Sequence, residues 1–319
     1  MSYRITCFYL PFPKIALIVI VMFSQKIQIT VLALRNTIAC WRYSDMRVFI
    51  SIDMEGISSI VDWSEVDRNS SEYSFARKLM VGDLNAAIKG AKESGADEIV
   101  VSDAHGSMRN LRPEDVDPKA ILVRGSPKPW SMMEGIDDNF DAALYVGYHS
   151  MRNTPLGIMC HTIRGSAVDA IWINGRETGE FGLNSALAGT HGVPSVFLAG
   201  DYAATQEAEA FVPGITTATV KWAVGRYSAR CLHPEESGRL ITAKVQEALS
   251  SGYPEPRRVK EPLEAKIRYG SETMCDVVSL MPSFERVDGR TMRGSFKDYR
   301  TALNAIRASI YLAGAAERR

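Results

Sequence analysis

Hydrophobic and polar positions downstream of residue 45 alternate between short apolar runs and longer amphipathic stretches. Val48 to Ile52 (VFISI) is β-branched and aromatic, which predicts a buried strand that ends before Asp53. Residues 72–93 carry apolar side chains at a helical period and end near Gly95, which predicts an amphipathic helix. Residues 98–102 (EIVVS) predict a second strand. We therefore expect a β-α-β unit with parallel strands and a right-handed crossover.

The same alternation continues along the chain. Residues 142–148 (AALYVGY) and 195–199 (SVFLA) predict two further strands. Helices are expected over residues 181–190, 201–211, 234–251 and 298–313. Strands that alternate with helices are typical of the α/β class. We predict a three-layer α/β/α fold with a largely parallel central sheet.

The first 45 residues differ from the rest. Ile15 to Phe23 is an unbroken apolar run, but a membrane-spanning helix needs roughly 20 such residues, so this segment is too short to span. A signal peptide is one interpretation, although no small-x-small cleavage pattern follows the run. A poorly ordered or non-native extension is the other, because Met46 directly precedes the first predicted strand. We expect one α/β domain over residues 46–319, with a C-terminal subdomain from about residue 257 as a further division.

Composition narrows the class of partner and compartment. The chain has 319 residues, of which 46% are apolar and 23% charged, enough for the core of a globular enzyme. Lys plus Arg and Asp plus Glu are both 37, so nothing favours nucleic acid or an anionic membrane, and we expect a small-molecule partner. Five scattered cysteines form no C-x-x-C pair. Free thiols in a reducing cytosol fit best, which predicts a cytoplasmic protein.

Chemistry-bearing side chains follow the predicted strands at the point where each strand ends. Asp53 and Glu55 are two residues apart, so an extended backbone places both carboxylates on the same side. Asp103 and His105 repeat this spacing after the second strand, and His149 follows the third. Ligands of open α/β sheets collect at the carboxyl ends of the strands. Carboxylates and imidazoles without thiolates suit zinc, or less well manganese or iron.

The number of these groups favours two metals over one. Two carboxylates after the first strand, two histidines and a further carboxylate, Glu180, would serve a metal pair about 3.5–4 Å apart. An aspartate bridging the pair would position a shared hydroxide. The sequence therefore predicts a two-metal hydrolytic site at the carboxyl ends of the strands.

Each candidate also has a structural interpretation. Asp53 could simply end a strand, and His105 could lie in a loop. His149 could be a buried core histidine, and Glu180 could stabilise a helix start. Asp103 is better suited to orient a ligand than to bind metal. Taken together, however, the five groups favour a metal site.

Other polar residues are assigned structural roles. His191 and His233 lie at predicted helix ends, and Asp201 is expected to cap the helix that follows it. A thiol nucleophile at Cys160 beside His161 is disfavoured, because adjacent residues on an extended chain point in opposite directions.

Five short motifs carry a resemblance to a known family. They are Ser51 to Ser58 (SIDMEGIS), Ser102 to His105 (SDAH), Gly147 to His149 (GYH), Cys160 to Thr162 (CHT) and Gly179 to Asn184 (GEFGLN). In this order they resemble the zinc D-aminopeptidases of the dipeptide-operon type. The resemblance runs from about Met46 to Asp201 and continues more weakly to the C-terminus, and residues 1–45 have no counterpart in it.

The resemblance implies a ligand set and an activity. It places two zinc ions per chain on Asp53, Glu55, His105, His149 and Glu180, and a catalytic histidine at His161. It implies an aminopeptidase that removes N-terminal D-amino acids such as D-alanine from short peptides, through a hydroxide activated by both zinc ions. It also implies a ring-shaped homo-oligomer, for which a decamer is one size. A metal-dependent amidase acting on a non-peptide amide, or a non-catalytic metal- or ligand-binding protein, are the alternatives.

Overall fold

The computed structural model describes residues 6–8, 17–23, 26–32 and 46–316. Contacts divide the chain into two units, Met1–Ser44 and Asp45–Arg319. In the first unit β1 (Thr6–Phe8), β2 (Leu17–Phe23) and β3 (Lys26–Leu32) form an antiparallel sheet in the order β1-β2-β3. The poor order expected of residues 1–45 stays a prediction, because the remainder of that segment lies outside the described residues.

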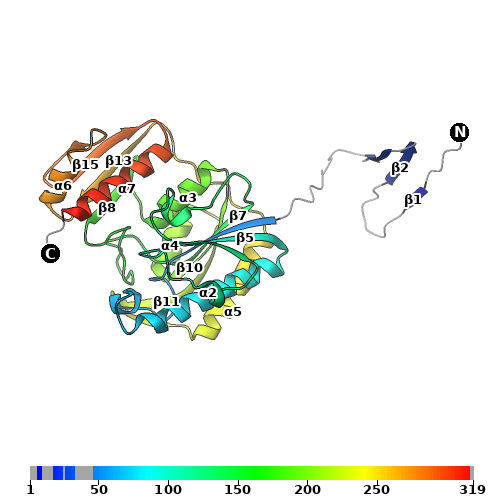
Figure 1. Cartoon of the computed structure of the whole chain (residues 1–319), viewed down its shortest axis with the longest axis horizontal. Coiled ribbons are helices and arrows are strands. Elements are labelled where there is room, and N and C mark those ends of the chain that lie inside the picture. Colours follow the sequence, from blue (N-terminus) through cyan, green and yellow to red (C-terminus); the bar gives the residue numbers. More distant parts are fainter. Residues whose placement is uncertain (1–5, 9–16, 24–25, 33–45, 317–319) are drawn as a thin grey trace. The chain divides into compact units, whose positions relative to one another are not determined.

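A seven-stranded sheet forms the centre of residues 46–316 (Figure 1). Its order is β12-β11-β10-β7-β4-β5-β6. The strands are β4 (Met46–Ile52), β5 (Ala96–Asp103), β6 (Ala120–Val123), β7 (Ala142–Tyr148), β10 (Ser195–Asp201), β11 (Thr216–Gly225) and β12 (Ser228–Cys231). Every neighbouring pair in this sheet is parallel except β11 and β12. The predicted α/β fold with a largely parallel central sheet is confirmed.

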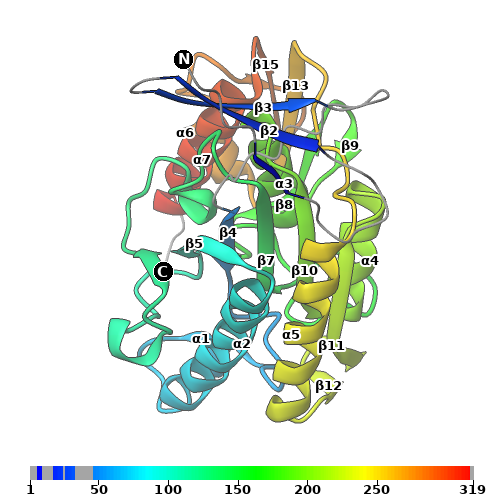
Figure 2. The ribbon, with the colours of Figure 1, turned by 90° about the vertical axis from the view of Figure 1, so that its right-hand side faces the viewer.

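Helices cover both faces of this sheet because its strands are apolar on both sides. Along β4, Val48 and Ile50 pack into one core cluster and Phe49 into the other, as the alternation of a strand requires. The first face is covered by α2 (Tyr73–Glu93) and α5 (Pro234–Ser250), which lie side by side (Figure 2). The second is covered by α3 (Glu180–Thr190) and α4 (Tyr202–Phe211).

A second sheet, of five strands, lies within the same described region. Its order is β14-β15-β13-β8-β9, and each pair is antiparallel. The strands are β8 (Val168–Ile173), β9 (Arg176–Glu177), β13 (Leu263–Tyr269), β14 (Glu285–Arg286) and β15 (Thr291–Phe296). The helices α6 (Glu272–Val278) and α7 (Tyr299–Ala315) pack on it. Because β13 pairs with β8, strands from the middle and the end of the chain share this sheet, and the subdomain boundary near residue 257 stays a prediction.

Short elements complete the fold. They are α1 (Trp63–Val66) and the 3₁₀ turns Pro113–Asp115 and Ser131–Met133. Among the described residues, no helix combines the length and apolar character needed to cross a bilayer.

Two glycines on α2 test the packing of α2 against α5. A Cβ added at Gly90 would lie 2.8 Å from both Thr242 O and Val245 Cβ of α5, whereas one added at Gly82 would meet no described atom within 4 Å. We expect Gly90→Ala to lower the free energy of unfolding by roughly 1–3 kcal/mol through overpacking. Gly82→Ala should raise it by roughly 0.5–1 kcal/mol, because alanine favours the helix. Urea unfolding measures both, and equal shifts would show that the interhelical contact is not decisive.

Candidate active site

The backbones at the ends of β4 and β7 lie so close together that a side chain at Gly56 or Gly147 would collide with the neighbouring strand. A Cβ on Gly56 would lie 2.0 Å from Tyr148 O, and one on Gly147 would lie 2.3 Å from Asp53 O. Gly147 also has a φ of +70°, which disfavours other residues. The Gly56 N–H donates to Gly147 O at 2.8 Å. The loop after β4 therefore lies directly against the end of β7, which brings Asp53 beside His149.

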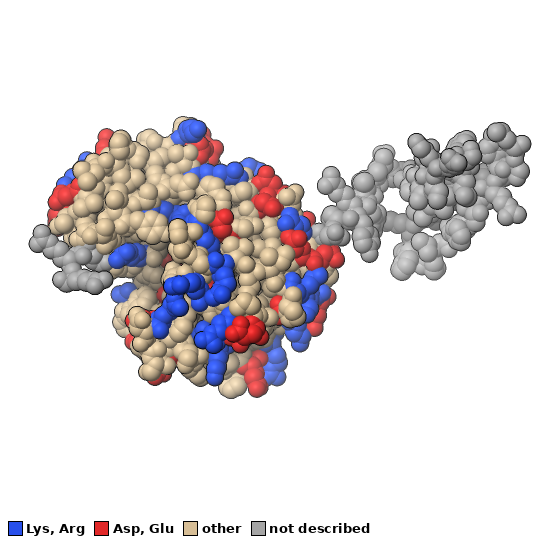
Figure 3. Space-filling view, viewed as in Figure 1, with Lys and Arg blue, Asp and Glu red and all other residues tan. Residues whose placement is uncertain are grey.

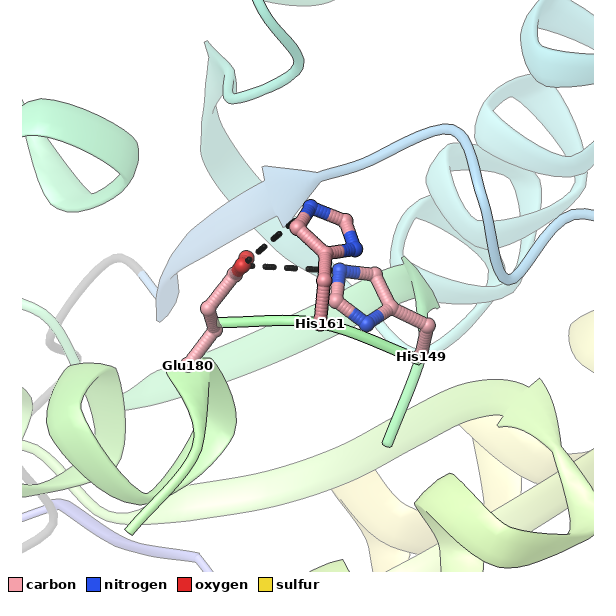
Figure 4. Close-up of side chains that lie close together, drawn as sticks. All are labelled: His149, His161 and Glu180. Atoms are coloured by element: carbon pink, nitrogen blue, oxygen red, sulfur yellow. Dashed lines mark ion pairs between the residues drawn. The ribbon is translucent and has the colours of Figure 1, made fainter. Parts of the chain in front are cut away.

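Two groups of side chains meet at this point and share one histidine. The ligand atoms of Asp53, Glu55 and His149 lie within 4.8 Å of one another, and so do those of His149, His161 and Glu180. All five side chains are buried. Figure 4 shows the two imidazole rings stacked and Glu180 facing both. The predicted ligands from separate strands and α3 are thus brought together.

His149 presents one nitrogen to both groups. Its Nδ1 donates to Ser150 O at 2.9 Å, which orients the ring. Its Nε2 lies 3.4 Å from Asp53 Oδ2 and 3.5 Å from Glu180 Oε1, and it has no hydrogen-bond partner in the described part of the chain. A buried nitrogen aimed between two carboxylates is the arrangement of a metal ligand.

His105 lies on the other side of Asp53. Its Nδ1 is 2.9 Å from Glu55 Oε2 and 3.4 Å from Asp53 Oδ1, and its Nε2 is 3.1 Å from Val66 O. His105 is therefore beside the Asp53 and Glu55 carboxylates, as predicted, although its nitrogens do not belong to either group of three.

The electrostatics of the cluster favour a bound cation. Burial and the charge of Glu55 raise the pKa of Asp53 to about 7. Burial lowers the pKa of His149, but the charge of Glu180 outweighs it and holds that pKa well above 6.5. Burial raises the pKa of Glu55, but the charge of His105 outweighs this effect and holds that pKa well below 4.5. Because three buried carboxylates require positive charge here, and the donors are imidazole nitrogens and carboxylate oxygens, the residues fit zinc.

His161 is held in a defined orientation at the edge of the cluster. Its Nδ1 lies 3.0 Å from Met159 O, and its ring stacks on His149 with a centroid distance of 4.1 Å. Trp63 packs edge-on against it at 5.3 Å. Its Nε2 lies 3.8 Å from Glu180 Oε1, so this nitrogen faces the site.

Asp103 supports the site from a distance. Its carboxylate accepts from the backbone N–H groups of Asn110 at 2.5 Å and Leu111 at 2.9 Å, and from the Asn110 side chain. The Asn110 side chain also donates to His105 O at 2.8 Å. Asp103 therefore holds the loop that carries His105 and does not contact the imidazole.

The residues assigned structural roles lie outside the cluster. His191 bonds Asp138 and Arg300, and His233 accepts from Glu235 N at the start of α5. Asp201 occupies the N-cap position of α4, as predicted, although its side chain forms no hydrogen bond with the first turn of the helix. Its Oδ2 accepts from Ile158 N at 3.2 Å, because the carboxylate is directed into the loop before β8.

Lys221 is a supporting residue that the sequence did not indicate. It is fully buried on β11, and its Nζ donates to Glu55 O at 2.6 Å, to Ile57 O at 2.9 Å and to Ile60 O. Burial lowers its pKa to about 8, and the charge of Asp201 opposes this. Lys221 thus ties the loop that carries Glu55 to the central sheet.

A pocket of about 350 Å³ opens over the cluster. Its wall includes Asp53, Glu55, His105, His161 and Glu180 together with residues of α7. On the face shown in Figure 3, both basic and acidic side chains are exposed, and the basic ones gather toward the middle of that face.

The fold and the site define the chain as a metal-dependent hydrolase of the α/β class. Residues 46–308 match the family model of the D-aminopeptidases, peptidase family M55. The chain belongs to this family, and it is an enzyme that acts on peptide bonds.

Two similar proteins support this assignment. A D-aminopeptidase of Bacillus subtilis (strain 168) is 38% identical over 247 residues, which are 77% of this chain and 89% of the relative. A solved structure, the Zn-dependent D-aminopeptidase DppA from Bacillus subtilis, described as a self-compartmentalizing protease, matches with a TM-score of 0.82 and 37% identity. The match covers 84% of this chain and 98% of that one. The resemblance inferred from the five motifs is confirmed.

Lys221 offers a test of how the site is supported. In Lys221→Met, the carbonyls of Glu55, Ile57 and Ile60 lose their donor, at a cost of roughly 1–3 kcal/mol for each buried group left unsatisfied. We expect a lower free energy of unfolding and a weaker affinity for zinc, measured by urea unfolding and by chelator competition. Lys89→Met, at an exposed position of α2, should change stability by no more than about 0.5 kcal/mol. Unchanged zinc affinity in Lys221→Met would show that this lysine does not support the site.

Proposed function

We propose that this protein is a zinc aminopeptidase that removes N-terminal D-amino acids, such as D-alanine, from short peptides. The observation that carries the proposal is the pair of buried ligand groups that share His149 beneath a pocket. Membership of the D-aminopeptidase family and similarity to a Zn-dependent relative support both the metal and the substrate class.

The proposed ligands are Asp53, Glu55, His105, His149 and Glu180. The two oxygens of Asp53 face different histidines, Oδ1 toward His105 and Oδ2 toward His149, each at 3.4 Å. This supports Asp53 as a ligand that two metals would share. Glu55 and His105 would complete the ligands of one metal, and His149 and Glu180 would complete those of the other. Bound zinc would supply Lewis acidity and would activate water near neutral pH.

His161 is proposed as the catalytic histidine. Because Nδ1 is held by Met159 O, the ring presents Nε2 to the pocket and to Glu180. A nitrogen fixed in this way can stabilise the oxyanion of the tetrahedral intermediate or deliver a proton to the leaving amine. Trp63 packs against the same imidazole ring, with a centroid distance of 5.3 Å.

The remaining predictions about the working protein are proposals as well. The self-compartmentalizing relative supports a homo-oligomer, for which we propose a ring and, as one size, a decamer. A pocket of about 350 Å³ is near the lower end of the range for small-molecule sites, which supports short peptides as substrates. Cys160, Cys231 and Cys275 are free thiols, which supports a cytoplasmic location. We propose no nucleic-acid or membrane partner, and no observation favours a non-peptide amidase or a non-catalytic binding protein.

Metal removal tests the proposed reaction. We expect about two zinc ions per chain by elemental analysis, as a two-metal site requires. The protein should release D-alanine from D-Ala-D-Ala and no L-alanine from L-Ala-L-Ala. Dialysis against a chelator should abolish this release, and added zinc should restore it. Metal without cleavage of the D-dipeptide would contradict the substrate, and release that survives complete metal removal would contradict the mechanism.

A substitution at His161 separates catalysis from metal binding. His161→Ala should lower kcat by about 10²–10⁴-fold, the usual contribution of a positioned acid or base, while the zinc content stays unchanged. His233→Ala, at the start of α5 and away from the pocket, is the control and should alter neither quantity. If His161→Ala loses zinc, the residue is a ligand and the proposed role is wrong.

A further inference from the structure

Part of the pocket wall comes from one face of the last helix. Leu303, Arg307, Ile310 and Tyr311 of α7 all line the pocket. Their spacings of three and four residues place them on one side of the helix. Arg307 is therefore a cationic group inside a pocket whose carboxylates, Asp53, Glu55 and Glu180, all belong to the metal cluster.

The guanidinium of Arg307 is fixed by neutral groups. It donates through Nη2 to Lys128 O at 2.9 Å and through Nη1 to Pro129 O. Lys128 in turn is buried, and its Nζ donates to Ser102 Oγ at 2.8 Å and to Asp103 O at 2.7 Å, at the end of β5. Arg307 is thus anchored to the strand whose following loop carries His105.

The positive charge of Arg307 is not balanced by a neighbouring carboxylate. Both of its acceptors are backbone carbonyls, and no carboxylate of residues 46–316 forms an ion pair with it. A guanidinium has five N–H donors, and the two carbonyls use two of them. An uncompensated, immobilised guanidinium in a pocket is suited to bind a carboxylate.

We propose that Arg307 binds the C-terminal carboxylate of the peptide substrate while the scissile amide lies at the metal cluster. This inference rests on the proposed function and deepens it, because it names the substrate class. Short peptides with a free C-terminus would make this contact in the pocket that Arg307 shares with the cluster, and peptides blocked at the C-terminus would lose it.

The contact lies away from the bond that is cut. It therefore contributes equally to the bound substrate and to the transition state, and its loss raises KM more than it lowers kcat. A merely structural role of Arg307 would instead affect all substrates alike.

The test compares D-Ala-D-Ala with its C-terminal amide in the zinc-loaded full chain. Wild-type protein should have a kcat/KM about tenfold to a hundredfold higher for the acid, the range expected for a charge-assisted hydrogen bond. Arg307→Met keeps the apolar stem and should bring the acid-to-amide ratio close to one by raising KM for the acid. Arg307→Lys keeps the charge without the two-point geometry and should give an intermediate ratio.

Arg300→Met is the matched control. Arg300 also lies on α7, bonds Thr190 and His191, and is not part of the pocket lining, so its loss should leave the ratio unchanged. An equal fall for acid and amide in Arg307→Met, or a wild-type ratio near one, would overturn this inference and leave the proposed function intact. If wild-type protein releases D-alanine from neither peptide, the proposed function fails and the inference fails with it.

Discussion

The backbone contact around Tyr148 O at the end of β7 is the constraint on which the site depends. A Cβ at Gly56 or at Gly200 would lie 2.0 Å from this oxygen, so neither position can carry a side chain without moving a strand end. With glycine at both, the loop after β4 and the end of β10 close against β7. Asp53 and Glu55 consequently lie beside His149, and the ligand atoms of the three residues fall within 4.8 Å of one another.

Polar anchors beneath the cluster hold this arrangement in place. Lys221 satisfies three carbonyls of the loop after β4, and Lys128 satisfies the carbonyl of Asp103 at the end of β5. Burying a lysine side chain is unfavourable unless its N–H groups have acceptors. Both lysines supply donors to buried loop carbonyls that would otherwise be unpaired. The loops that carry the candidate ligands Glu55 and His105 are therefore anchored to the sheet, and such anchoring suits a metal site.

The two sheets of residues 46–316 contribute different parts of the site. The parallel sheet and α3 supply the carboxylates and imidazoles, while α7, which packs on the antiparallel sheet, supplies apolar wall and the cationic group of Arg307. Arg307 donates to Lys128 O, and the Lys128 side chain donates to Asp103 O at the end of β5, so hydrogen bonds connect α7 to the strand that precedes His105. The proposed metal ligands and the proposed carboxylate-binding arginine thus lie on separate elements that line one pocket.

The sequence by itself determined the elements whose signals are local. Continuous apolar runs mark β4, β5 and β7 because these strands are buried on both faces, and the five candidate ligands were predicted because they follow strand ends or begin α3. The burial of Lys221 could not be predicted from the sequence. Side chains alternate between the two faces of a strand, and the alternation that buries Ala218 and Val220 would point residue 221 toward solvent. A register shift between Gly200 and Asp201, opposite Lys221, accompanies the break in that alternation. Nothing in the local sequence of the amphipathic helix α7 distinguishes Arg307 from its other polar residues. Arg307 reaches the pocket only because tertiary packing brings segments together that are distant along the chain.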